Sequence, residues 1–216
     1  ELKCKKVSIA SNDGTYSIDA VYSYPKGGEA YRFKWIMQKN GVLQLEYDYR
    51  PLDKIKMSGI TFNFPEKDII GAKILANGPY RVYNNRLKGG TLNLWDKTYN
   101  DAITGEVWNY PEFKGYYSLF YGMKLICPTP FEVYCASEDI FLHLFTPSVQ
   151  RLYDEKKNYT NPPYPSGNIS FMDAIPAVGT KFETAENYGP QSQLHQFKGF
   201  SDTPNMINKI YFKFNK

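Results

Sequence analysis

Hydrophobic and polar residues alternate with a period of two along much of the chain. The alternation is clearest in the segments 31–38 and 43–49, where every second residue is aromatic or aliphatic. Asn40-Gly41 lies between them and is typical of a type I′ hairpin turn, in which both central positions need a positive φ. The pattern predicts a hairpin whose inward face carries Tyr31, Phe33, Trp35, Met37, Leu43, Leu45, Tyr47 and Tyr49.

Other segments show the same period or short apolar runs bounded by turn residues. An earlier hairpin is predicted from 6–10 and 16–24, around Asn12-Asp13-Gly14. Almost no stretch has the 3.6-residue period of a helix, and two long loops are expected at 147–167 and 199–205. The chain therefore reads as one all-β domain, residues 1–216, with a sandwich or barrel architecture. The remaining predicted strands are 59–64, 69–75, 116–126, 131–136, 140–145 and 209–214.

Composition and charge narrow the class of partner. Aromatic residues make up 17% of the 216 residues, which fits a tyrosine-rich β protein and, as a second interpretation, a surface that stacks on sugar rings. The formal net charge is only +4, and the lysines lie mostly singly, so we expect no nucleic-acid partner. No apolar run reaches the ~20 residues of a membrane span, so we expect no membrane partner.

The cysteines and histidines give no sign of a metal or cofactor site. Cys4, Cys127 and Cys135 do not form a disulfide framework, although Cys127 and Cys135 flank a predicted hairpin and could face one another. We expect them to be unpaired. His143 and His195 are too distant in sequence to form a recognised zinc ligand pair, and His143 lies in an apolar segment typical of a core-lining or edge histidine. No nucleotide-binding loop or Gly-x-Ser-x-Gly motif is present, so no cofactor is expected.

One segment resembles a known family. Residues 78–86 read Gly-Pro-Tyr-Arg-Val-Tyr-Asn-Asn-Arg, and Trp-Asp-Lys follows at 95–97. This resembles the Gly-Pro-x-x-x-Tyr-x-x-Arg signature of the C-terminal β-sandwich domain of family 2 glycoside hydrolases, the β-galactosidase group. Further family-like segments occur in the same order along the chain, and the last three resemble the Bacteroidetes-type branch: 40–47, 59–62, 110–116, 136–139, 167–171 and 175–180.

The resemblance implies a large two-sheet antiparallel supersandwich of the galactose mutarotase-like type. It implies a non-catalytic role, because in the family both catalytic carboxylates come from a (β/α)8 barrel, which takes about 250 residues. The expected partners are that barrel and a carbohydrate, in a parent enzyme that is periplasmic or secreted in a bacterium. Since the chain starts at Glu1 without a methionine or signal peptide, we expect an excised or processed piece of a longer protein.

The resemblance and the residue chemistry together nominate site residues. Gly78 and Pro79 are expected to form a tight turn at a sheet edge, and the Arg86 guanidinium is expected to hold Glu112 bidentately as a structural pair. The alternative is that the loops of Arg86 and Glu112 line the rim of the parent enzyme's active-site cleft. The family's Gly-rich loop ends in Asp-Ser-Trp, whereas this chain has no tryptophan in 188–193, which leaves Tyr188 as a substitute and puts galactose specificity in doubt. The candidate carbohydrate contacts are Tyr80, Trp95, Trp108 and Tyr188. No catalytic or metal-ligating residue is predicted.

Two alternative functions remain open at this point. A free-standing carbohydrate-binding module would use Trp95, Trp108 and the tyrosines as a stacking platform. An aldose 1-epimerase-like enzyme would need a carboxylate and a histidine to move the protons of ring opening, and only His143 and His195 are available.

Overall fold

The computed structural model describes residues 3–24, 29–49, 54–98, 115–145, 163–180, 182–195 and 208–214. These residues form β-strands joined by turns, loops and three short 3-10 helices, so the predicted all-β class is confirmed. The strands are β1 (Lys3–Asn12), β2 (Thr15–Ser23), β3 (Glu29–Met37), β4 (Val42–Tyr49), β5 (Ser58–Phe62), β6 (Gly71–Val82), β7 (Thr91–Thr98), β8 (Tyr116–Ile126), β9 (Phe131–Cys135), β10 (Phe141–Leu144), β11 (Ile169–Ala174) and β12 (Asn208–Phe214). The 3-10 helices are η1 (Glu66–Asp68), η5 (Ala185–Asn187) and η6 (Pro190–Ser192).

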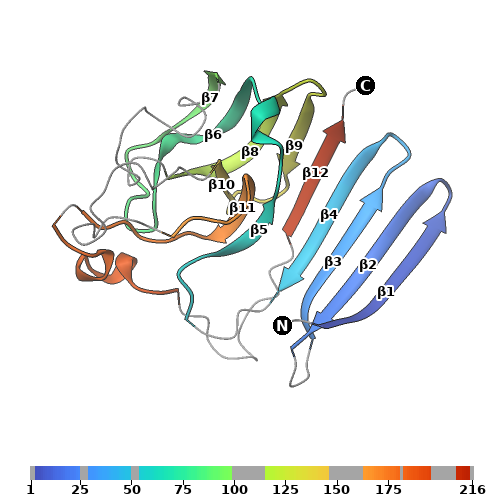
Figure 1. Cartoon of the computed structure of the whole chain (residues 1–216), viewed down its shortest axis with the longest axis horizontal. Helices are drawn as coiled ribbons and strands as arrows, with labels where there is room; N and C mark the ends of the chain where they lie inside the picture. The colour runs from blue at the N-terminus through green and yellow to red at the C-terminus, as the bar shows by residue number, and fades with distance from the viewer. Residues whose placement is uncertain are drawn as a thin grey trace.

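The strands form one antiparallel sheet that folds over itself into two layers. Its order is β1-β2-β3-β4-β12-β9-β8-β10-β11-β5, and β6 joins β8 to β7 on a side branch (Figure 1). The change of layer occurs along β8, where Gly122–Leu125 pairs with β9 while Tyr117 pairs with Leu142 of β10. The two sheets that the resemblance implies are thus the two layers of a single, open sheet.

The core fills the space between the layers because the alternating apolar residues of both layers face each other. In the first layer, Leu45 of β4 and Ile210 of β12 lie opposite one another and are almost fully buried. From the second layer, the Phe62 ring of β5 packs against Trp35 of β3 and Phe212 of β12, with centroid distances of 6.3 and 5.7 Å. Removal of these rings from water is the main driving force for closing the two layers.

Both predicted hairpins are present, but their turns differ from the expectation. In the β3–β4 turn only Gly41 has a positive φ (80°), and the N–H of Gln38 donates to Val42 O (2.9 Å), so the loop has three residues. The two-residue turn with positive φ at both positions occurs instead in the β1–β2 hairpin, at Asp13 (46°) and Gly14 (74°). The assignment of the type I′ turn to Asn40-Gly41 was therefore wrong, because an extra residue on one strand was not visible in the pattern.

Gly78 and Pro79 do not form the predicted tight turn. They lie inside β6, joined by a cis peptide bond, and Gly78 pairs with Thr91 of β7. A side chain at Gly78 would meet the Tyr117 ring at 2.7 Å, so packing requires the glycine here. Pro79 is tolerated in the strand because the β6–β8 register is irregular between Asn77 and Val82, which frees the residues between them from regular pairing.

Most predicted strands recur within two residues of their expected bounds, but β6 continues to Val82, seven residues beyond the predicted end at Leu75, and β7 and β11 were not predicted. β7 is an edge strand with mostly exposed residues, and β11 is a buried strand without alternation. Neither context produces a period-two signal. The prediction of unpaired cysteines is confirmed, since Cys4, Cys127 and Cys135 are all free thiols.

Candidate functional site

A pocket of about 320 Å³ lies where the β6–β7 connection meets the segment that follows β11. It brings together two of the predicted residues, Arg86 and Tyr188, which are far apart in sequence. Arg86 comes from the family-like segment 78–86, and Tyr188 from the place where the family's aromatic loop would lie. The lining residues are Asn85, Arg86, Val178, Gly179, Thr180 and Tyr188.

The β6–β7 connection is held in place by backbone and amide hydrogen bonds. A tight turn forms where the N–H of Arg86 donates to Tyr83 O (2.8 Å). Asn85 then makes a reciprocal pair with Val178, because its amide nitrogen donates to the Val178 carbonyl (2.9 Å) and its amide oxygen accepts from the Val178 N–H (3.0 Å). The same amide nitrogen also contacts the hydroxyl of Ser192 at 3.0 Å. These bonds make Asn85 the main clamp of the pocket.

Asn84 adds a second set of anchors beside it. Its N–H donates to Pro176 O (2.9 Å), and its side-chain amide donates to Gln191 O (2.7 Å). The two asparagines therefore tie one connection to two different parts of the chain. Sequence reasoning missed them, although an Asn-Asn pair next to a turn is the available signal, since asparagine side chains readily bond nearby backbone.

Tyr188 forms one wall of the pocket with part of its ring in water. Its side chain is 44% exposed, and its hydroxyl lies 2.7 Å from the Thr180 hydroxyl. The preceding 3-10 helix η5 fixes its backbone, because the Tyr188 N–H donates to Ala185 O (2.9 Å). An aromatic face in water beside hydroxyl groups is an arrangement that suits contact with a sugar.

A buried aromatic cluster continues from the same turn into the interior. Tyr83 packs edge-to-face on Tyr116 with ring centroids 5.9 Å apart, and its hydroxyl lies 3.0 Å from that of Tyr164. His143 lies between Tyr116 and Tyr164, 5.0 and 5.2 Å from their ring centroids. Burial lowers the pKa of His143 to about 3, so the imidazole is neutral at pH 7. His143 is thus a core histidine, as the sequence predicted.

His195 has a different setting. Its backbone forms an isolated bridge with Ile55, and its Nε2 lies 2.8 Å from the carbonyl of Ile175. This contact joins the segment after η6 to the residues just beyond β11. The side chain thus has a structural partner.

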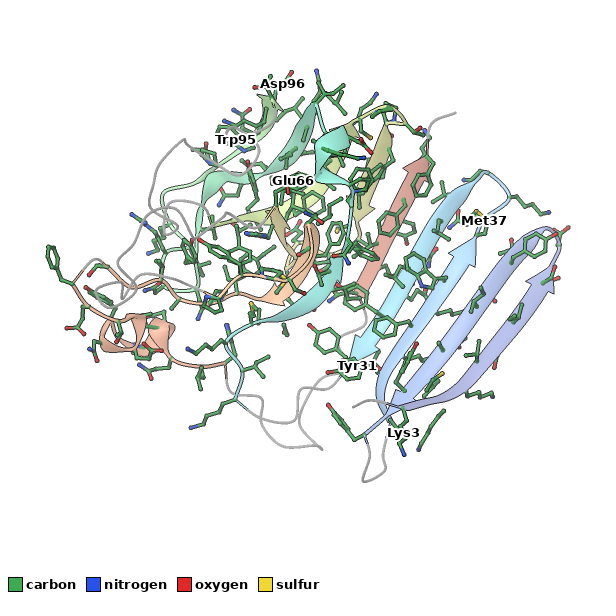
Figure 2. The ribbon with its side chains drawn as sticks, in the orientation of Figure 1. Lys3, Tyr31, Met37, Glu66, Trp95 and Asp96 are labelled. Carbon is green, nitrogen blue, oxygen red and sulfur yellow. The ribbon has the colours of Figure 1, made fainter. Side chains whose placement is uncertain are left out.

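Trp95 is not among the residues that line the pocket. Trp95 lies on β7, where its indole N–H donates to Ala76 O (3.0 Å) and the Lys97 ammonium lies 5.6 Å from its ring centroid (Figure 2). Tyr80 belongs to β6. Trp108 and Glu112 lie outside the described residues, so the Arg86–Glu112 pair stays a prediction.

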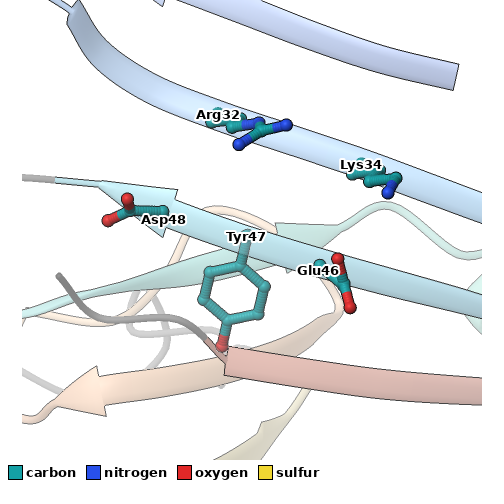
Figure 3. Close-up of a pocket in the computed structure, with 5 residues that line it drawn as sticks. All are labelled: Arg32, Lys34, Glu46, Tyr47 and Asp48. Carbon is teal, nitrogen blue, oxygen red and sulfur yellow. The ribbon is translucent and has the colours of Figure 1, made fainter.

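A second pocket, of about 210 Å³, opens on the outer face of β3 and β4 (Figure 3). Figure 3 shows charged side chains on both strands, while the Tyr47 ring points to the opposite face, toward β12. The Arg32 guanidinium holds the Asp19 carboxylate through Nε (3.1 Å) and Nη2 (2.5 Å), and this bond lowers the pKa of Asp19. We interpret this pocket as part of a solvated, charged sheet face and not as a binding site. The lining residues are Arg32, Lys34, Glu46, Tyr47 and Asp48.

The described residues also lack two features that would indicate other functions, a metal site and a membrane-spanning helix. Within those residues, no group of three or more His, Cys, Asp or Glu side chains could hold a metal ion. The same part of the chain contains no helix that is long and apolar enough to cross a membrane.

Two comparisons of the sequence with known proteins found no match. No protein-family model matches the chain, and no curated protein matches its sequence. The features that bear on function are therefore the order of the motifs and the geometry of the pocket that contains Arg86 and Tyr188.

Proposed function

We propose that the chain is the non-catalytic C-terminal domain of a family 2, β-galactosidase-like glycoside hydrolase. In this role it supports the catalytic (β/α)8 barrel and shapes the carbohydrate-binding cleft. The observation that carries the proposal is the pocket in which Arg86, from the family-like segment, meets Tyr188, from the substitute aromatic loop. Two parts of the chain that the motif order nominated separately converge at one place.

The pocket has the groups that a sugar rim needs. The partly exposed Tyr188 ring offers an apolar face for the C–H side of a pyranose. The Thr180 hydroxyl and the Arg86 guanidinium offer hydrogen-bond donors to ring hydroxyls. Because the pocket is open and small, it supplies part of a binding site, and a neighbouring domain supplies the rest.

An apolar patch beside the pocket supports a docked neighbour. Leu75, Leu92 and Leu94 are 42%, 54% and 59% exposed on the outer face of the β6–β7 hairpin. Leu75 and Leu94 lie directly opposite in the register, so they form a contiguous surface. Exposed apolar groups gathered in this way mark an interaction surface. The same hairpin carries the connection that contains Arg86, so a barrel packed on this patch would border the pocket.

Titration calorimetry with galactosides and with pectin- or hemicellulose-derived oligosaccharides tests the proposal. A partial rim is expected to bind in the millimolar range or weaker, about −4 kcal/mol. Tyr188→Ala should abolish this weak binding. Phe182→Ala should not, because Phe182 is an exposed aromatic residue outside the pocket lining. Binding nearer micromolar that is lost in Tyr188→Ala would favour a free-standing carbohydrate-binding module instead.

A further inference from the structure

The first three strands form an arm, defined here as β1, β2 and β3, that extends beyond the second layer (Figure 1). One row of residues across it shows the change of environment. Leu45 of β4 is 1% exposed and Trp35 beside it is partly buried, but Ile18 of β2 is 47% exposed and Ile9 of β1 is 77% exposed. The apolar face of the core thus continues along the arm, where none of the described residues covers it.

The uncovered part is a contiguous apolar patch on one face of the sheet. Residues that lie opposite in an antiparallel register share a face, and the registers put Ile9 beside Ile18 and Tyr16 beside Met37. Together the patch exposes roughly 500 Å² of apolar surface, within the upper range for a monomeric protein. Its members are Val7 (57% exposed), Ile9 (77%), Tyr16 (59%), Ile18 (47%) and Met37 (41%).

The opposite face of the arm carries charged residues beside the partly buried Val21 and Ile36. Arg32 of β3 and Asp19 of β2 form a two-bond ion pair there, and Lys34 lies opposite Asp19 in the register. At the hairpin tips the Lys39 ammonium contacts Asp13 at 2.5 Å. The arm is therefore an amphipathic sheet, with one face suited to water and the other to burial.

In the part of the chain that the structure describes, the second layer stops before it reaches the patch. β5 is its last strand, and the Phe62 ring of β5 packs over Trp35 and Phe212, in β3 and β12. A cover for Ile9, Ile18 and their neighbours must therefore continue that layer outward. It must be about 10 Å away, apolar toward the arm and polar toward water.

We propose that a second copy of the chain supplies this cover, with the two arms stacked apolar face to apolar face about a two-fold axis. The arm itself has the required thickness and amphipathic pattern, and the five patch residues carry no charge that would repel a copy. Each arm then occupies the place where the second layer of the other copy ends. The stacked arms repeat the two-layer construction of the body, and the contact is self-complementary, as a two-fold dimer requires.

The size of the patch sets the expected strength. A standard interface buries about 800 Å² per partner, so a patch of roughly 500 Å² predicts a reversible dimer with a Kd in the micromolar range. Sedimentation equilibrium of the 216-residue chain, from about 1 to about 200 µM, should show this monomer–dimer equilibrium. Ile9→Lys should raise the Kd by at least about tenfold, because a lysine would be buried in the apolar contact.

Two matched variants separate face stacking from other effects. Ala10→Lys places the same charge on the same edge strand but on the opposite face, and Ile70→Lys changes an isoleucine that is 64% exposed outside the arm. Both should dimerise as the parent chain does. Circular dichroism and thermal unfolding should be unchanged in all three variants when they are measured below the Kd, where the parent chain is monomeric, since each altered side chain is exposed.

Several results would overturn the proposal. A chain that stays monomeric at about 200 µM has no second copy on its arm, and another partner then covers it. If Ile9→Lys leaves the dimer intact, the dimer forms through another surface. If Ala10→Lys raises the Kd as much as Ile9→Lys does, the two copies are joined through the edge of β1 and not through the apolar face. Tyr188→Ala should not affect the dimer, so the outcome is independent of sugar binding.

Discussion

At the residue scale, Asp173 of β11 connects the two layers through polar contacts. Its carboxylate accepts hydrogen bonds from the Tyr49 hydroxyl of β4 and from the Asn208 amide of β12. Burial raises the pKa of Asp173 from 3.8 to about 6, which the bond from Tyr49 only partly offsets. The neighbouring Cys135 thiol has a raised pKa for the same reason, with the Asp173 charge adding to the effect of burial.

This pKa predicts a pH-dependent stability. Since the folded-state pKa lies above the unfolded value, the stability that protonation contributes is complete below about pH 4 and is lost as the pH rises through about 6. The loss should be about 3 kcal/mol, because each pKa unit corresponds to about 1.4 kcal/mol. Urea unfolding of the parent chain and of Asp173→Asn between these pH values should show the dependence only in the parent. The exposed Asp139→Asn serves as the control, and equal slopes in all three proteins would refute the assignment.

At the element scale, Asn85 holds the β6–β7 connection to the segment that follows β11. Asn85→Ala removes the reciprocal bonds to the Val178 backbone and the contact with the Ser192 hydroxyl. The Val178 N–H then has no amide oxygen to donate to, which should lower the free energy of unfolding by about 2 kcal/mol. Sugar binding should weaken as well, because the wall formed by residues 178–180 is no longer held to the β6–β7 connection that carries Arg86.

The matched control for this change is Asn93→Ala on the exposed edge strand β7. There the side-chain oxygen accepts from the adjacent Leu94 N–H (2.8 Å) and from no other described residue, so the stability should change by less than about 0.5 kcal/mol. Chemical unfolding and calorimetry measure both effects. If Asn85→Ala were as harmless as the control, the pocket would be held by other contacts.

At the scale of the whole molecule, the proposed role predicts that the chain alone has no hydrolytic activity. A retaining glycosidase needs two carboxylates about 5 Å apart around the scissile bond, and the resemblance assigns both to the separate barrel. A nitrophenyl galactoside should therefore remain intact with the purified chain. Turnover that a single Asp or Glu substitution abolishes would contradict the proposed role.

Polarimetry with freshly dissolved α-glucose or α-galactose addresses the epimerase alternative. Mutarotation should proceed at the uncatalysed rate, because neutral, buried His143 and carbonyl-bonded His195 are poorly suited to transfer protons to a sugar. Acceleration that disappears in His195→Ala would favour the epimerase. The parent chain, assayed at the same concentration, gives the reference rate.

The local hydrophobic pattern alone was sufficient to predict the strands that have one face exposed to solvent and the other face buried. Two hairpins were predicted from the alternation in β3 and β4 and from the Asp13-Gly14 and Asn40-Gly41 turns. This worked because the alternation of apolar and polar residues within such a strand shows which of its faces is buried. The same pattern indicated the all-β class and the apolar face that runs into the arm. It did not reveal β7, which lies exposed at an edge, or β11, which is buried on both faces, because neither environment produces alternation.

The tertiary structure decided what depends on residues far apart in the chain. Gly78 is needed for the approach of Tyr117, and Asn85 for its bonds to Val178, and neither partner can be read from the local sequence. Likewise, Ile9 and Leu45 have the same apolar character in the sequence, but only the end of the second layer at β5 leaves one exposed and buries the other. Sequence pattern determines which face of a strand is apolar, whereas long-range packing determines what covers that face.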